Sequence, residues 1–136
     1  MGRILGLDYG IKKTGIAVTD PLQLIVNPLT VINTEKLLDF LIEYSENENI
    51  EKIVIGESKH KDGNQVYFEK DIQLLIKKLK ENISDIVIDR QDEDFTSLEA
   101  KELIGKLNLK KKKRQDKTLV DRLSSVLILQ RYLNHI

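Results

Sequence analysis

The first twenty residues constrain the fold most, because they place two short apolar runs on either side of a glycine-containing turn. Residues 4–7 form an apolar run that ends on the carboxylate of Asp8, and residues 16–18 form the second run. Two short strands joined by a tight turn predict a β-hairpin. A carboxylate at the end of a central strand is costly unless it is solvated, paired or bound to a metal. Asp8 is therefore either a turn-capping residue or the first ligand of a metal-dependent enzyme.

Length and composition favour one soluble domain over residues 1–136. The chain has 40% hydrophobic and 32% charged residues, which is typical of a globular protein. It has no cysteine and only two histidines, which excludes disulfides and thiolate metal sites and disfavours a multi-histidine zinc site. Any metal would be held by oxygen, which points to Mg²⁺ or Mn²⁺. Because neither a membrane-length apolar run nor a signal-peptide pattern is present, we expect a cytoplasmic protein with no membrane contact.

The charge is balanced overall but concentrated locally. The net charge is zero, yet residues 106–117 contain seven basic residues and one acid. A basic segment on an otherwise acidic body is typical of a phosphate-binding surface, although a lone lysine run is also common in solvated loops. The residues that we expect to contact nucleic acid there are Lys110, Lys111, Lys112, Lys113 and Arg114.

The hydrophobic periodicity predicts a mixed five-stranded sheet flanked by helices, in the order β-β-β-α-β-α-β-α-α. Pro28 makes the third strand an edge strand or a bulged one. Thr34 is the expected N-cap of the first helix. An acid-rich loop is expected to begin at Asp89. The strands are expected at residues 4–8, 16–18, 24–32, 53–56 and 86–88, and the helices at 34–46, 65–79, 96–107 and 117–134.

Three acids are candidates for one site. Strands that end at Asp8, Gly56 and Asp89 are expected to be parallel neighbours, and ligands bind beyond the carboxyl ends of such strands. The acidic loop at residues 92–94 would reach the same edge. Asp121 lies three and four residues before Ser124 and Ser125, two small residues that would let its helix face approach another surface closely. The alternative for Asp121 is a solvated acid near a helix start. Converging carboxylates repel one another unless a divalent cation compensates, and two such cations support phosphodiester cleavage.

The order of the motifs resembles the YqgF/RuvX family, whose members are described as Holliday junction resolvases and as pre-16S rRNA nucleases. The resemblance covers essentially the whole chain. It implies an RNase H-like fold and a catalytic, metal-binding trio on Asp8, Glu93 and Asp121, with Mg²⁺ or Mn²⁺ as cofactor. The matching segments are residues 4–10, 14–20, 54–56 with 62–63, 92–93 with 95–100, and 117–121 with 124–130.

Two departures from the family pattern concern substrate contacts. Asp94 stands where the family usually has arginine, which removes a cation near Glu93, and Glu57-Ser58 replaces a short apolar-proline pair. Lysines near the expected site remain available for phosphate contact. Besides the basic run, these are Lys12, Lys13, Lys59 and Lys61, with solvated loops as the alternative interpretation.

These features predict a metal-dependent nuclease that hydrolyses phosphodiester bonds in nucleic acid. The resemblance favours structured RNA, namely 5′-end maturation of precursor 16S rRNA in ribosome biogenesis, whereas the residues allow branched DNA such as a Holliday junction equally well. A monomer or a weak homodimer is expected. A catalytically silent nucleic-acid-binding module is an alternative, because of Asp94. A phosphotransferase of the actin/hexokinase type would need two such domains, and the chain has no P-loop.

Overall fold

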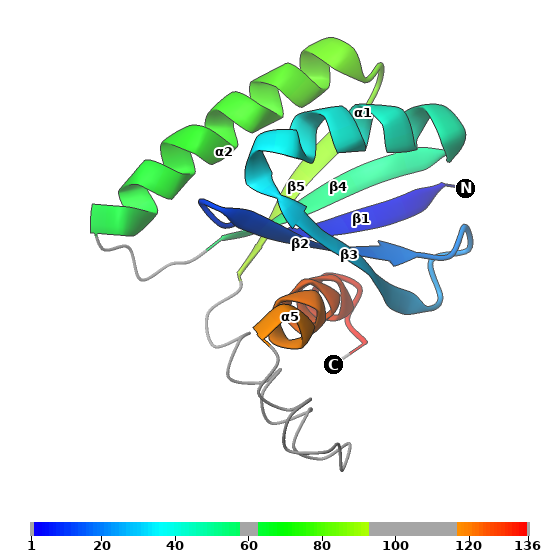
Figure 1. Cartoon of the computed structure of the whole chain (residues 1–136). Coiled ribbons are helices and arrows are strands. Elements are labelled where there is room, and N and C mark those ends of the chain that lie inside the picture. Colours follow the sequence, from blue (N-terminus) through cyan, green and yellow to red (C-terminus); the bar gives the residue numbers. More distant parts are fainter. Residues whose placement is uncertain (1, 58–62, 93–116, 136) are drawn as a thin grey trace.

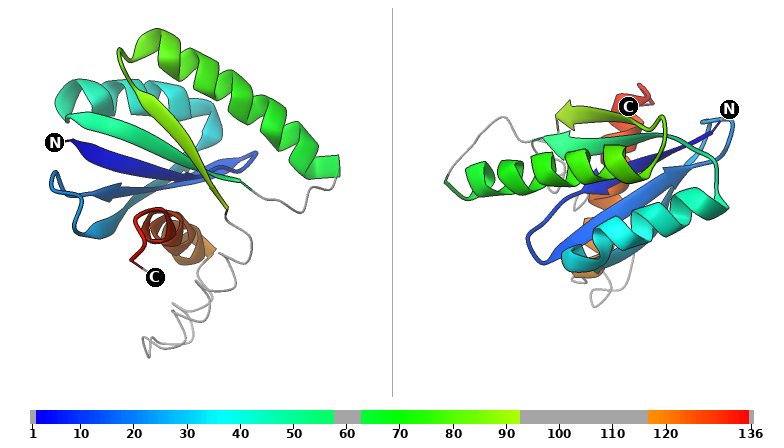
Figure 2. Two further views of the ribbon diagram at one scale, coloured as in Figure 1. Left: turned by 180° about the vertical axis from the view of Figure 1, so that it is seen from behind. Right: turned by 90° about the horizontal axis from the view of Figure 1, so that it is seen from above.

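The computed structural model describes residues 2–57, 63–92 and 117–135, and of residues 63–67 and 117–122 it describes the backbone alone. The described elements form a five-stranded sheet in the order β3-β2-β1-β4-β5. Helices α1 and α2 cover one face, and α5 crosses the other (Figures 1 and 2). The mixed α/β architecture predicted from the sequence is therefore confirmed. The predicted helix at residues 96–107 lies outside the described residues.

The N-terminal hairpin forms as predicted. Strand β1 (Arg3–Asp8) pairs antiparallel with β2 (Lys13–Thr19), and β2 pairs antiparallel with β3 (Val26–Asn33). Strand β3 is an edge strand whose pairing shifts register between Ile16 and Ala17, next to Pro28, as expected for a residue that cannot donate a ladder hydrogen bond.

Strand β3 begins two residues later than predicted, because an aspartate organises the preceding turn. The Asp20 carboxylate accepts hydrogen bonds from the backbone N–H groups of Leu22, Leu24 and Ile25. These N–H groups are thus satisfied by a side chain instead of by a sheet ladder. The apolar pattern of Leu24 and Ile25 was compatible with a strand, but both side chains are more than half exposed.

The other two strands join β1 in parallel, as predicted. Strand β4 (Ile50–Glu57) lies beside β1, and β5 (Val87–Asp92) lies beside β4. The prediction of an acidic loop from Asp89 was wrong, because the ladder continues until Asp92 pairs with Glu57. Four polar residues complete this strand because β5 is at the edge of the sheet, where polar side chains stay partly solvated.

The first helix begins differently from the prediction. A 3₁₀ turn (η1, Thr34–Lys36) leads into α1 (Leu37–Asn47), and neither element has a side-chain N-cap. The Thr34 hydroxyl instead donates to the carbonyl oxygen of Gly10 at 2.6 Å and accepts from the Thr14 hydroxyl at 2.9 Å. Thr34 therefore fastens the β1–β2 turn instead of capping the helix.

The remaining helices differ from the prediction mainly in their bounds. Helix α2 spans Gly63–Asn82 and is longer at both ends than expected, and α5 spans Lys117–Tyr132. Helix ends inferred from periodicity alone commonly shift by a few residues. In the part of the chain that the structure describes, no helix is long and apolar enough to span a bilayer.

Two apolar cores form on the two faces of the sheet. The first contains Leu5 and Leu7 of β1 with residues of α1 and α2, and the second contains Ile4 with Val126, Ile128 and Leu129 of α5. The alternation of side chains along β1 therefore places Gly6 and Asp8 on the α5 face. A Cβ atom on Gly6 would lie 2.5 Å from Leu129 Cγ, so the missing side chain lets α5 approach the sheet closely.

Candidate active site at the carboxyl edge of the sheet

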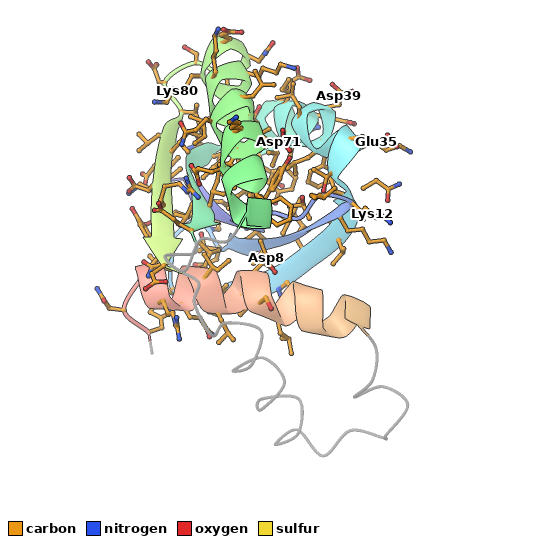
Figure 3. All side chains as sticks on the ribbon, turned by 90° about the vertical axis from the view of Figure 1, so that its left-hand side faces the viewer. Asp8, Lys12, Glu35, Asp39, Asp71 and Lys80 are labelled. Carbon is orange, nitrogen blue, oxygen red and sulfur yellow. The ribbon has the colours of Figure 1, made fainter. Side chains whose placement is uncertain are left out.

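Among the residues that the structure describes, Asp8 is the centre of the candidate site. It is the last residue of the central strand β1, is partly buried, and lies on the face that α5 covers. Figure 3 shows its side chain between the end of the sheet and α5. A carboxylate in this position is partly shielded from water and still accessible from the sheet edge, which suits a metal ligand or a catalytic base.

The ends of β4 and β5 bring further polar residues to the same edge. The register pairs Leu7 with Ile55, and Ile55 with Arg90, so Asp8, Gly56 and Gln91 follow in the next row. Asp92 and Glu57 form the last pair, one residue further along. The predicted convergence of these strand ends is confirmed. Among the described side chains, however, no three acids or histidines come together as a metal site.

Helix α5 carries the third predicted acid, Asp121, of which the structure describes the backbone only. Ser124 and Ser125 are buried, as are Val126, Ile128 and Leu129 of the same helix, and Leu123 is partly buried. Burial of both serines agrees with the expectation that these small residues let α5 pack closely. Glu93 lies outside the described residues and follows Asp92 directly in the chain.

Two of the predicted phosphate-binding residues are described, and both are exposed. Lys12 lies in the β1–β2 turn, and Lys13 begins β2. The Thr34 N–H group holds the turn by donating to the Lys12 carbonyl oxygen at 2.9 Å. A Cβ atom on Gly10 would lie 2.5 Å from the Lys13 carbonyl oxygen, so the turn has no room for a side chain there. The other predicted contacts, Lys59, Lys61 and Lys110 to Arg114, lie outside the described residues.

Sequence reasoning missed a third lysine near this turn. Lys36 and Lys13 line the same shallow hollow of about 350 Å³, together with Val31, Ile32 and Asn33. The two amino groups come from elements that are twenty-three residues apart in the sequence, so no local pattern signals their proximity. Two cations over one hollow form a suitable contact for a phosphate group.

Arg90 links the carboxyl ends of β4 and β5 to α2. Its guanidinium forms a bidentate ion pair with Glu69 of α2, at 2.8 and 3.0 Å, and also donates to the carbonyl oxygens of Ile55 and Gly56. Both charged side chains are largely shielded from solvent. Arg90 therefore ties α2 to the carboxyl ends of both β4 and β5. The sequence gives no signal for this pair, because its members are twenty-one residues apart.

A second polar cluster fastens α5 to the sheet on the opposite face. The Tyr132 hydroxyl donates to the Asp89 carboxylate and accepts a hydrogen bond of 2.6 Å from Lys52. The hydrogen bond to Tyr132 and the Asp89 carboxylate raise the pKa of Lys52. Burial, followed by the hydrogen bond to Asp89, raises the pKa of Tyr132. Tyr132 thereby anchors the C-terminal end of the helix that contains Asp121.

Comparison with known proteins agrees with this arrangement. The family model described as "RuvX: Holliday junction resolvase" matches residues 2–135. The chain belongs to the RuvX family. A protein named "Putative pre-16S rRNA nuclease" from Phocaeicola vulgatus is 44% identical over 98% of this chain and 96% of its own length. A protein of the same name from Bacteroides fragilis is 43% identical over the same shares. The resemblance identified from the sequence motifs is confirmed.

A solved structure supports the fold assignment for this RuvX family member. RuvC of Thermus thermophilus, in complex with a Holliday junction substrate, superposes with a TM-score of 0.64 at 14% identity. The alignment covers 99% of this chain and 96% of that chain. At this identity the likeness concerns the fold alone, and it confirms the predicted RNase H-like fold class.

Proposed function

We propose that this RuvX family member is a metal-dependent nuclease that hydrolyses phosphodiester bonds, with Asp8, Glu93 and Asp121 as catalytic and metal-binding residues. The observation that carries the proposal is the position of Asp8, which is partly buried at the carboxyl end of the central strand. Strand β5 ends on the same edge directly before Glu93, and α5, which contains Asp121, covers the face on which Asp8 lies.

The donor atoms suit a hard divalent cation. Asp8 offers carboxylate oxygens, Glu93 and Asp121 carry the same group, and the chain has no cysteine. Carboxylates are the ligands that Mg²⁺ and Mn²⁺ prefer. When bound, such ions activate the attacking water and neutralise charge on the leaving oxygen. Asp8 would then position its ion, and the close contact of α5 with Gly6 would fix the approach of Asp121 to the same edge.

Lysines around the edge would position the substrate backbone. Lys12 and Lys13 lie in and beside the turn that follows Asp8, and Lys36 shares a hollow with Lys13. We propose that these residues bind phosphates together with Lys59, Lys61 and the basic run from Lys110 to Arg114. Contacts of this kind fix the register of the backbone and carry no base information.

We propose the 5′ region of precursor 16S rRNA as the substrate, since several relatives at more than 40% identity are named for it. The family description favours a second candidate, a Holliday junction. Symmetric cleavage of a junction would require two active sites and hence a dimer. The single domain over residues 1–136, the monomeric or weakly dimeric state and the cytoplasmic location stay predictions.

The first test compares the wild-type protein with Asp8→Asn on end-labelled precursor 16S rRNA and on a four-way DNA junction. We expect cleavage with Mg²⁺ or Mn²⁺ and none with EDTA. Loss of a metal-binding carboxylate removes several kcal/mol of transition-state stabilisation, so the rate should fall by about 100-fold or more. Asp39→Asn, which changes an exposed acid on α1, is the matched control and should leave the rate unchanged.

The outcomes separate the alternatives. Preferential cleavage of the RNA supports rRNA processing, and symmetric cuts in the junction support a resolvase. Metal-independent binding by both proteins without any cleavage would contradict the nuclease proposal and leave a nucleic-acid-binding module.

A further inference from the structure

A groove of about 230 Å³ opens between α1 and α2, on the face of the sheet opposite α5. Its walls include Leu38 of α1 and Leu74 of α2, and its mouth carries Glu35, Asp71 and Lys78. Leu74 is 51% exposed, so part of the apolar lining of the groove is open to solvent. The groove therefore combines leucine side chains with exposed charged groups in its lining.

The groove reaches the end of β1 through Tyr9. Tyr9 lines the groove and packs against the core cluster of α1 and α2, whereas the preceding Asp8 lies on the α5 face. The two consecutive residues thus lie on opposite sides of one strand end. Figure 3 shows Asp71 and Glu35 on the side of the molecule where Asp8 also reaches the surface. A nucleic-acid strand bound at Asp8 would have to round the end of β1 at Tyr9 to enter this groove.

The charges at the groove entrance select against a phosphate. Glu35 and Asp71 place two exposed carboxylates there, against the single amino group of Lys78. The Asp71 carboxylate is near enough to Tyr9 to contribute, after burial, to a raised pKa of the tyrosine hydroxyl. A phosphate would be repelled, and the lysines that would attract it, Lys12 and Lys13, lie in and beside the turn after Asp8.

A nucleobase fits both properties of the groove. Its flat faces are apolar enough to pack against leucine and tyrosine side chains, and an exocyclic amino group can donate to a carboxylate. Single-stranded nucleotides in RNA are recognised in this way, through stacking of a splayed-out base and hydrogen bonds to its edge.

We propose that the groove between α1 and α2 binds one unpaired base of the substrate strand, and that Glu35 and Asp71 favour a base with an exocyclic amino group. The inference rests on the proposed nuclease function and specifies its substrate: the strand is unpaired at a fixed position relative to the scissile phosphate. Fully paired duplex of the same sequence would leave the groove empty and bind more weakly.

The test measures binding of a fluorescently labelled single strand to the Asp8→Asn protein, so that cleavage does not interfere. The strand is taken from the cleaved region, and an abasic nucleotide replaces each position in turn. We expect one position at which loss of the base weakens binding by about 5- to 100-fold, which corresponds to the stacking contribution of one base. The same substitution should have a much smaller effect when Leu74→Ala removes the exposed wall of the groove.

The base preference has a separate readout. At the sensitive position, the Asp8→Asn protein should bind adenine or cytosine more tightly than uracil. Adding Glu35→Gln and Asp71→Asn to this protein should reduce the ratio of the two affinities. Removing two negative charges should strengthen the attraction of the protein for every strand equally. The ratio of the affinities for two bases is therefore independent of this general gain. Asp39→Asn, which removes an acid of α1 that does not line the groove, should leave the ratio unchanged.

Suppose that the Asp8→Asn protein binds the strand, the wild type cleaves it, and no abasic position weakens binding. This result would overturn the base-binding groove and leave the nuclease proposal standing. A scan with one sensitive position that Leu74→Ala does not affect would also overturn it. A protein that neither binds nor cuts nucleic acid would overturn both proposals.

Discussion

Gly6 shows how one missing side chain decides the position of a helix. It lies in the middle of β1, where most residues would project a side chain into α5. The space for its Cβ atom is occupied by the fully buried side chain of Leu129. The distance between α5 and the sheet, and with it the position of Asp121 relative to Asp8, therefore depends on this glycine.

Gly6→Ala should displace α5 and destabilise the protein by about 1–3 kcal/mol, which is typical of overpacking. Urea denaturation followed by circular dichroism measures the change in the free energy of unfolding. Because the clash is with Leu129, the double variant with Leu129→Ala should be more stable than the sum of the two single effects predicts. If the two changes in the free energy of unfolding are strictly additive, the methyl group of the new alanine does not clash with Leu129.

At the scale of elements, the Lys52–Tyr132–Asp89 cluster anchors the C-terminal end of α5 to β4 and β5. Tyr132→Phe removes the hydroxyl and both of its hydrogen bonds, and should lower the free energy of unfolding by about 1–2 kcal/mol. Thermal melts at neutral pH measure this loss. An unchanged melting temperature would indicate that the packing of α5 alone holds the helix end.

The same cluster predicts a loss of stability at alkaline pH. The folded protein raises the pKa of both Lys52 and Tyr132 above their ordinary values of 10.5 and 10.0. The folded state therefore holds these protons more tightly than the unfolded state, and the resulting stabilisation is complete below about pH 10 and declines as the pH rises further. Comparing urea midpoints at pH 8 and above pH 10 measures the decline. The decline should be smaller in Tyr132→Phe, and an identical decline would contradict the assignment.

Arg90 plays the corresponding role for α2 and the strand ends. Arg90→Met removes the guanidinium that donates to the Glu69 carboxylate and to two strand-end carbonyls, while Glu69 keeps its hydrogen bond from Gln73. The change should destabilise the protein by about 1.5–3 kcal/mol. Arg3 and Glu48, an exposed pair 3.3 Å apart at the other end of β1, provide the matched control. Glu48→Gln should cost no more than about 1 kcal/mol. Equal losses in urea denaturation would contradict a special role for Arg90.

At the scale of the whole molecule, the exposed lysines near the carboxyl edge should govern the salt dependence of substrate binding. Each phosphate contact releases counterions, so replacing Lys12, Lys13 or Lys36 by Gln should reduce the slope of log K against log salt by about one. Lys80→Gln is the control, because Lys80 is exposed near the far end of α2. Fluorescence anisotropy from 50 to 300 mM salt measures the slopes. A slope that changes equally in all variants would indicate diffuse attraction instead of contacts at this edge.

Much of this fold could be predicted from the sequence because its determinants are local. The apolar runs at residues 4–7 and 53–55 and the helical spacing of Ile72, Leu75 and Leu79 each indicate one element, and burial confirms them. The same runs place Asp8 at a strand end. The family motifs add Glu93 and Asp121 to the predicted site, and the roles of these two residues stay predictions.

Two of the errors occurred where contacts between residues distant in the sequence overrode the local pattern. Thr34 has the residue type of an N-cap, but its hydroxyl bonds Gly10, twenty-four residues away. Residues 89–92 read as a loop because they are polar, yet pairing with β4 extends the strand through them. Such hydrogen bonds depend on which elements become neighbours, which a local pattern does not encode.

By itself, the sequence determined the types and order of the described elements, the absence of thiolate ligands and the carboxylate at the end of the first strand, since each follows from residue type and short-range spacing. Only the tertiary structure decided that Gly6 admits α5, that Arg90 joins α2 to two strand ends, and that Tyr9, Glu35 and Asp71 share one groove. These groups are far apart along the chain, and packing of the two cores against the sheet is what brings them together.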